Sequence, residues 1–203
     1  MISDQKPPEY TMEKAIFYGQ EFIVSPDILI PRIETEEIIN MVPEPKIIAD
    51  VGCGCGCIGI TLAKKFPDAT VYLSDISEAA LKIARRNSKK ETIITSDLLS
   101  HYPKNLYFDA IVANLPYIPT DRINKLPGSV KNFEPHLALD GGPNGTTLIN
   151  KLLSQLPKHL KPGGLAILEI DDTHTLKDFK IPKNFKAKIK KDQFGRNRFL
   201  TVH

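Results

Sequence analysis

Cysteine is scarce in this sequence and confined to one place. The 203 residues include three cysteines, Cys53, Cys55 and Cys57. Cysteines this close together cannot tie distant segments, so we exclude a disulfide framework and expect a reducing, cytoplasmic setting. One-residue gaps in a tight loop aim thiolates poorly at a metal, and no neighbouring histidine completes a tetrahedral set. We therefore expect no metal site and interpret the cysteines as small side chains that fill the loop.

Long apolar runs are absent as well. No segment reaches the roughly 18 apolar residues that a membrane-spanning helix needs. The polar residues 1–8 lack the apolar core of a signal peptide. We expect no membrane association, and we expect a monomer. The length, with 41% hydrophobic and 25% charged residues, suits one globular domain with a small extension.

Acidic residues are rare in the last part of the chain, although the net charge is only +3. From residue 177 onward, nine lysines and arginines face two acids, Asp178 and Asp192. Two interpretations stay open. The basic groups protect the edge of a sheet from pairing with other chains, or they contact RNA or a ribosome-associated partner.

Apolar runs of strand length alternate with helix-like segments from residue 46 onward. We predict strands at 46–51, 70–74, 92–96, 108–113 and 165–170, with helices at 58–66, 77–88 and about 144–160. This alternation predicts an α/β fold, a doubly wound and mostly parallel sheet. A C-terminal antiparallel hairpin, 185–191 and 198–202 with its turn at Gly195, brings the total to about seven strands.

The first 43 residues are expected to form a separate N-terminal part ahead of the main domain, residues 44–203. Residues 1–9 are predicted to be a disordered lead, and 9–17 a short helix. Strand, turn and strand follow over 17–24, with Gly19 in the turn. A last helix is predicted at 36–41, with acidic residues favourably placed at its N-terminus.

A glycine-rich stretch, Asp50 to Gly59, joins the first strand of the main domain to its helix. Residues 54–59 spell G-x-G-x-x-G, which lets backbone N–H groups approach a ligand at the positive end of a helix. Asp75 ends the next strand, where a carboxylate can accept hydrogen bonds from ribose hydroxyls. These features fit a nicotinamide dinucleotide and S-adenosylmethionine equally well.

Asp50 separates the two cofactors, because it lies immediately before the glycines. A carboxylate there repels a pyrophosphate but suits a ligand that carries an ammonium and a sulfonium. After the third strand, Asp97 can accept from an adenine amino group while Leu98 covers the ring; the alternative for Asp97 is a turn residue. We therefore predict S-adenosylmethionine, bound by Asp50, Gly52, Cys53, Gly54, Cys55, Gly56, Asp75, Asp97, Leu98 and Asn114.

The tetrapeptide Asn114-Leu115-Pro116-Tyr117 follows the next strand and is our candidate for the catalytic residues. An amide nitrogen is a poor nucleophile because its lone pair is delocalised, so its methylation needs acceptors that hold its N–H groups. The Asn114 side-chain oxygen and the Leu115 carbonyl can serve, since Pro116 cannot continue the sheet. Tyr117 supplies an apolar or stacking wall. The alternative is a strand-ending turn, but agreement with the cofactor features in chain order favours the chemical role.

Six stretches along the chain share the pattern of one family. They are Tyr18–Phe22, Pro31–Glu36, Asp50–Gly59, Asn114–Tyr117, Phe133–Gly142 and Asp192–Arg198. The sequence thereby resembles the HemK/PrmC group of protein-(glutamine-N5) methyltransferases, which have the class I S-adenosylmethionine-dependent methyltransferase fold. Phe133–Gly142 is the most specific stretch, because general methyltransferases and dehydrogenases have no reason to carry it. The resemblance implies methylation of the glutamine in the Gly-Gly-Gln motif of peptide chain release factors.

The sequence departs from the family pattern at Leu115, where the family usually has proline. The acceptor there is a main-chain carbonyl, so we expect activity to survive. Asn-Leu-Pro-Tyr also resembles adenine-N6 dimethyltransferases of ribosomal RNA. An adenine-N6 methyltransferase acting on RNA or DNA, with Tyr117 stacked on the base, is therefore the alternative function. A non-catalytic cofactor-binding module is the third hypothesis.

A second departure concerns substrate docking. The family's N-terminal helical domain has almost no counterpart before Tyr10, so we expect a reduced form that works without it, a shortened chain, or a different partner. The resemblance also places the loop of Arg32 and Glu34 near the site. These two side chains either line the acceptor channel or form an ion pair that holds the loop.

Overall fold

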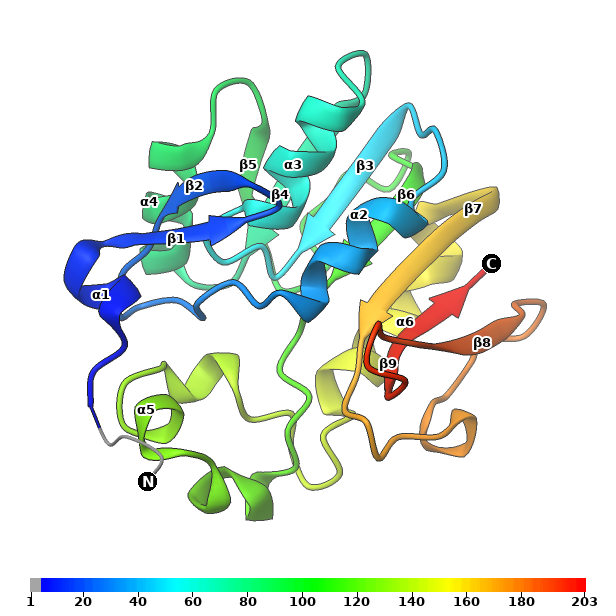
Figure 1. Cartoon of the computed structure of the whole chain (residues 1–203). Coiled ribbons are helices and arrows are strands. Elements are labelled where there is room, and N and C mark those ends of the chain that lie inside the picture. The colour runs from blue at the N-terminus through cyan, green and yellow to red at the C-terminus, as the bar shows by residue number, and fades with distance from the viewer. Residues whose placement is uncertain (1–4) are drawn as a thin grey trace.

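A seven-stranded sheet forms the centre of the molecule, a computed structural model that describes residues 5–203 (Figure 1). The strand order is β5-β4-β3-β6-β7-β9-β8. The sheet is parallel from β5 to β7 and antiparallel from β7 to β8. The strands are β3 Ile47–Val51, β4 Thr70–Asp75, β5 Thr92–Thr95, β6 Phe108–Ala113, β7 Leu160–Glu169, β8 Ala187–Lys191 and β9 Asn197–Val202. The prediction of a doubly wound sheet with a C-terminal antiparallel hairpin is confirmed.

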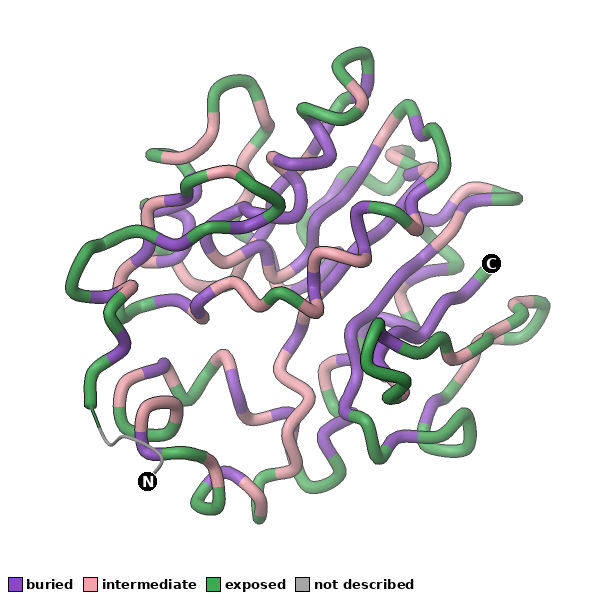
Figure 2. Tube along the Cα trace, viewed as in Figure 1, coloured by how far each residue is buried: buried purple, intermediate pink, exposed green. Residues whose placement is uncertain are grey.

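Helices cover both faces of the sheet, because alternate side chains of the inner strands point to opposite faces. Ile48 of β3 packs into one core with residues of α2 (Glu37–Met41), α3 (Cys57–Lys65) and α4 (Glu78–Asn87). Its neighbour Ala49 packs into a second core with α6 (Thr147–His159). The central strands are buried along most of their length (Figure 2). No helix within residues 5–203 combines the length and apolar character needed to cross a membrane.

The helix after β4 illustrates how local sequence sets the elements. Ser77 caps α4 by accepting from the Ala80 backbone nitrogen at 3.2 Å, as predicted. Glu78 lies in the first turn and Arg85 in the last, which suits the helix dipole. Buried Leu81 packs against the sheet. The capping serine, the charges and the apolar face all agree on one helix.

The N-terminal segment differs from its prediction. A short helix, α1, covers Pro8–Met12, but Lys14–Phe17 forms a strand, β1, paired antiparallel with β2, Gln20–Ile23. Burial alternates along β1, which is the pattern of a half-buried strand and not of a helix. Of the predicted disordered lead, residues 1–4 lie outside the described range, and Pro8 and Glu9 are helical. The division at residue 43 stays a prediction.

One further boundary was wrong. The strand predicted at 165–170 begins at Leu160, so Lys161 to Gly164 lie inside β7 and do not precede it. An irregular register opposite Phe108 and Ala110 accommodates them. The helix predicted at 36–41 is present as α2, and a 3-10 turn, η1 Glu34–Glu36, precedes it. Shorter elements complete the chain: η2 Thr120–Lys125, α5 Gly128–Lys131, η3 His136–Ala138 and η4 Leu176–Asp178.

Candidate functional site

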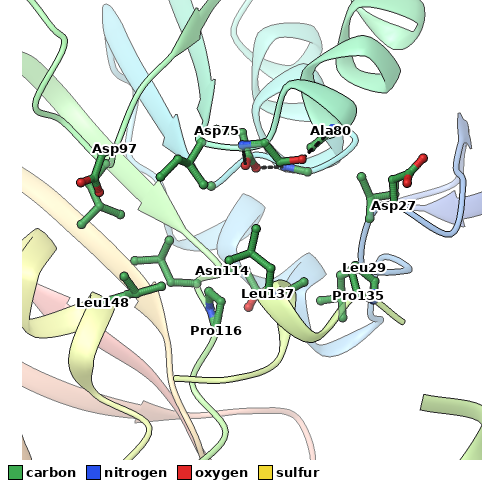
Figure 3. A pocket seen from close by; sticks show the side chains of 18 of the residues that line it. Asp27, Leu29, Asp75, Ala80, Asp97, Asn114, Pro116, Pro135, Leu137 and Leu148 are labelled. Atoms are coloured by element: carbon green, nitrogen blue, oxygen red, sulfur yellow. Dashed lines mark hydrogen bonds between the residues drawn. The ribbon is translucent and has the colours of Figure 1, made fainter. Parts of the chain in front are cut away.

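A pocket opens at the carboxyl ends of β3, β4, β5 and β6, where open α/β sheets bind their ligands. Asp75 lies on one side of it, and Asn114, Pro116 and Leu137 lie on the opposite side (Figure 3). Many of the residues predicted from the sequence line this pocket: Gly52, Gly54, Asp75, Asp97, Leu98, Asn114, Leu115 and Pro116. The remaining residues of the predicted set are not part of its lining: Asp50, Cys53, Cys55, Gly56 and Tyr117.

The glycine loop is fixed by backbone hydrogen bonds. The backbone nitrogens of Gly52 and Cys53 both donate to the Ser74 carbonyl, at 2.8 and 2.9 Å, which anchors the loop to β4. Gly52 has a φ of +70°, and a Cβ there would lie 2.8 Å from Leu115 Cδ2. The positive φ and this close approach both favour glycine where the loop passes the Asn114–Tyr117 segment. Gly56, with a φ of +83°, precedes the first residue of α3.

Asp50 lies fully buried beneath this loop. Its Oδ2 accepts from the backbone nitrogen of Gly59 in α3 at 2.8 Å, while its Oδ1 has no hydrogen-bond partner within residues 5–203. Burial raises the pKa of Asp50 to about 7, against the lowering effect of the Gly59 hydrogen bond. A buried carboxylate with an unpaired oxygen fits a cationic ligand and does not fit an anionic pyrophosphate.

Asp75 is held by two backbone donors. Its Oδ2 accepts from Gly54 at 3.0 Å and its Oδ1 from Ser77 at 2.9 Å. Burial nevertheless raises its pKa, because it outweighs these bonds. Each carboxylate oxygen keeps a further lone pair, so Asp75 can still accept from a ligand hydroxyl. The side chain thus joins the glycine loop to the start of α4.

Asp97 and Leu98 form the third part of the lining. Asp97 Oδ2 forms an ion pair with Lys151 Nζ at 2.5 Å. The Asp97 carbonyl accepts from the Ser100 backbone nitrogen, so Asp97 is also a turn residue. Leu98 is buried and has a φ of +55°, a conformation that a leucine rarely adopts. Strained residues cluster at functional sites, and this one forms an apolar wall of the pocket.

The Asn114–Tyr117 segment is held by a hydrogen-bond network that was not predicted. Asn114 Nδ2 donates to Thr35 Oγ1 at 3.1 Å, and Thr35 Oγ1 donates to Glu169 Oε2 at 2.6 Å. The Tyr117 hydroxyl donates to the other carboxylate oxygen of Glu169 at 3.0 Å. β6 ends at Ala113, so the Leu115 carbonyl lies beyond the last pair of the ladder. A signal for Glu169 was present, since it is a carboxylate inside the apolar run 165–170.

Two apolar segments form the rest of the wall, and sequence reasoning missed this role for both. Leu29 comes from the chain after β2, and Leu137 from η3. An ion pair joins these segments, since Arg32 Nη2 lies 2.6 Å from both carboxylate oxygens of Glu134. Burial raises the pKa of Glu134, and Arg32 opposes that effect. The pair also corrects one prediction: Arg32 and Glu34 do not bind each other.

Glu34 instead pairs with Arg196 Nη2, at 3.0 Å. Neither Arg32 nor Glu34 is part of the pocket lining. Both side chains therefore tie their loop to other parts of the molecule, Arg32 to the chain before η3 and Glu34 to the turn between β8 and β9.

The cysteines and the basic C-terminal region lie outside the lining. All three thiols are buried and none of them forms a disulfide. Burial raises the pKa of the Cys53 thiol. Across residues 5–203, no group of three or more His, Cys, Asp or Glu side chains is arranged to hold a metal ion. β8 is the outermost strand of the sheet and exposes Lys188, Lys190 and Lys191, as edge protection requires. Contact of this region with RNA stays a prediction.

Comparisons with known proteins identify relatives of this chain. The family model "Methyltransferase small domain" matches residues 12–125. The release factor glutamine methyltransferase of Koribacter versatilis is 44% identical over 175 residues, 81% of this chain and 62% of the relative. The protein of the same name from Flavobacterium psychrophilum is 31% identical and covers 100% of this chain and 77% of the relative.

The chain spans about three-fifths of the length of several of these relatives. Among solved structures, a methyltransferase from Pyrococcus furiosus superposes with a TM-score of 0.67, over 92% of this chain and 89% of the other. At 20% sequence identity this likeness shows a common fold.

Proposed function

Because this chain belongs to the release factor glutamine methyltransferase family, we propose that it methylates a peptide chain release factor. The methyl group passes from S-adenosylmethionine to the side-chain amide nitrogen, N5, of the glutamine in the Gly-Gly-Gln motif. The release factor is thus the proposed protein partner. The reaction is placed in the cytoplasm, where translation ends.

One observation carries the proposal. Asn114 lines the pocket, yet its amide nitrogen is already engaged within the protein, at 3.1 Å from Thr35 Oγ1. Because this bond turns the nitrogen toward Thr35, the side-chain oxygen is left on the opposite branch of the amide as an acceptor for a ligand. An acceptor at this place suits a substrate that brings N–H groups, which a glutamine amide does.

The proposed cofactor site is built from the glycine loop and three carboxylates. Gly52 and Gly54 offer backbone to the pocket, Asp75 is suited to ribose hydroxyls, and Asp97 with Leu98 is suited to the adenine ring. The unpaired Oδ1 of Asp50 supplies negative charge behind the loop. When bound, S-adenosylmethionine supplies an electrophilic methyl group on a positively charged sulfur.

The chain's own contribution to the chemistry is positioning. Asn114 Oδ1 and the Leu115 carbonyl accept the two N–H groups of the glutamine amide and turn its lone pair toward the methyl group. Pro116 keeps this segment out of the sheet. Leu29 and Leu137 limit the access of water. The nitrogen loses its proton to water, so no side chain has to act as a general base, and orientation provides the rate enhancement.

Methyl transfer with labelled S-adenosylmethionine tests this function. The protein is incubated with a release factor, and separately with ribosomal RNA, and the label is located by mass spectrometry. We expect one methyl group on the Gly-Gly-Gln glutamine. Label on an adenine would establish the nucleic-acid alternative. Binding of S-adenosylmethionine without transfer to either acceptor would leave a non-catalytic module.

A further inference from the structure

The Asn114 amide is held by a chain of buried groups from three distant segments. Thr35, in η1, is 2% exposed, and Glu169, at the end of β7, is 1% exposed. Asn114 and Thr35 are 79 residues apart in sequence, and Thr35 and Glu169 are 134 apart. Within the described structure, Thr35 is thus the only residue whose side chain hydrogen-bonds to both Asn114 and Glu169. A buried hydroxyl in this position determines what its two neighbours can do.

The direction of these hydrogen bonds follows from the number of protons available. The Thr35 hydroxyl has a single proton, and an ionised Glu169 can only accept, so the proton points to Glu169 Oε2 at 2.6 Å. Toward Asn114, Thr35 then presents lone pairs alone. The amide must therefore offer its NH2 group. The opposite orientation would place two acceptor oxygens 3.1 Å apart, which leaves both unsatisfied.

The charge state of Glu169 controls this direction. Its surroundings comprise the hydroxyls of Thr35 and Tyr117, together with Arg198 and Glu34. Burial raises the pKa of Glu169, and the two hydroxyls and Arg198 oppose this. A protonated Glu169 could donate to Thr35, whose own proton could then turn to Asn114 Oδ1. That arrangement would occupy the oxygen that the substrate amide needs.

We propose that Thr35 is a positioning residue: by donating to Glu169, its hydroxyl fixes the Asn114 amide with the oxygen toward the acceptor substrate. This inference rests on the proposed methyl transfer and adds a residue to it that does not touch the substrate. Small displacements of the groups that orient a substrate change the reaction rate strongly. A misplacement of roughly 1 Å lowers the rate by about 100-fold.

Two substitutions at one position test this role. Thr35→Val keeps the volume and removes the hydroxyl, whereas Thr35→Ser keeps the hydroxyl. We expect kcat to fall by about 100-fold in T35V and to stay close to wild type in T35S, with the Kd for S-adenosylmethionine unchanged in both. T35V added to Asn114→Ala should cause no further loss, since the residue it positions is gone. Unchanged kcat in folded T35V, or additive losses in the double variant, would overturn the proposal.

A second measurement separates this inference from the proposed reaction. The exchange of the Asn114 Nδ2 protons with water is followed by NMR, with the signals assigned by their loss in Asn114→Ala. We expect slow exchange in wild type and in T35S, and faster exchange in T35V. Fast exchange in wild type would overturn the proposal even if T35V did not fold. Slow exchange without methylation of a release factor would instead refute the proposed function alone.

Discussion

The two sides of the pocket are built in different ways. On the glycine side, residues 50–59 and Asp75, acceptors on β3 and β4 hold the backbone nitrogens of the loop and of α3: Gly52 donates to the Ser74 carbonyl at 2.8 Å, and the Asp50 side chain accepts from Gly59 nine residues later. On the amide side, residues 114–117, side chains do the holding, across 79 and 134 residues of sequence. The glycine side is therefore a local structure, and the amide side exists only when the whole sheet has formed.

This difference leads to a division of tasks. The glycine side offers backbone and buried negative charge, which suit the binding of a cofactor. The amide side offers one oriented acceptor, which suits the handling of the substrate. Substitutions on the glycine side should accordingly change cofactor affinity, and those on the amide side should change the rate. Variants on either side show whether cofactor affinity and rate are as separate as the construction of the two sides indicates.

The largest effect is expected from Asn114→Ala. Removal of one preorganised hydrogen-bonding group from an active site lowers kcat by about 100- to 1,000-fold. Because Asn114 handles the acceptor, the Kd for S-adenosylmethionine should change little. The measurement is single-turnover methylation of a release factor, combined with calorimetric cofactor titration, and the exposed Asn105→Ala is the matched control. A large loss of cofactor affinity in N114A would show that the two sides are not separate.

The next effect is a pH dependence on the glycine side. The pKa of Asp50 is raised to about 7, so in the ligand-free protein it gains a proton as the pH falls below that value. A cationic cofactor favours the ionised form, and binding must then release this proton. The Kd for S-adenosylmethionine should rise by about tenfold for each pH unit below 7.

The control for this dependence is Asp50→Asn, which removes the titrating group. Its affinity should be weak and nearly independent of pH between 5 and 8. The same residue affects stability with the opposite sign. A folded-state pKa above the unfolded value means that the ligand-free protein binds the extra proton, so its stability should fall as the pH rises toward 7. Equal pH dependence of binding in wild type and D50N would exclude this role for Asp50.

The glycine side of the pocket could be predicted from the sequence, whereas the hydrogen bonds of the amide side could not. The spacing of Gly52, Gly54 and Asp75 is a local pattern, and all three residues line the pocket. Thr35 and Glu169 were missed, because a hydrogen bond between residues 134 apart is a property of the folded sheet and not of any window of sequence. The strand at Lys14–Phe17 was read as helix since its alternation covers only four residues, too short for the period to decide.

Gly52→Ala tests the contact between the two sides. A φ of +70° disfavours alanine by about 1–2 kcal/mol, and the new Cβ would press on Leu115 Cδ2. Displacement of the loop should weaken cofactor binding by about tenfold, the equivalent of 1.4 kcal/mol.

The matched control is Gly163→Ala. Gly163 has a φ of +77°, and a Cβ there would meet nothing within 4 Å. Both variants should lose similar stability in thermal unfolding, and only G52A should lose affinity. A wild-type Kd in G52A would mean that the loop tolerates the displacement and that the close approach to Leu115 has no part in binding.

The smallest effect, and the sharpest test of the amide side, is expected from Tyr117→Phe. The ring stays, but Glu169 loses the donor at 3.0 Å. With its carboxylate ionised, Glu169 still accepts the hydrogen bond from Thr35. The kcat at high pH should therefore fall by less than about fivefold, which corresponds to one hydrogen bond of about 1 kcal/mol.

The same variant should shift the pH profile, because loss of a donor to the charged form raises the pKa of a carboxyl group further. Activity should therefore be lost at a higher pH on acidification than in wild type, as measured by kcat against pH with Asp50→Asn as the reference on the glycine side. An acid limb that stays in place in Y117F would mean that Glu169 does not govern the amide side, and the orientation of Asn114 would then have to come from Thr35 alone.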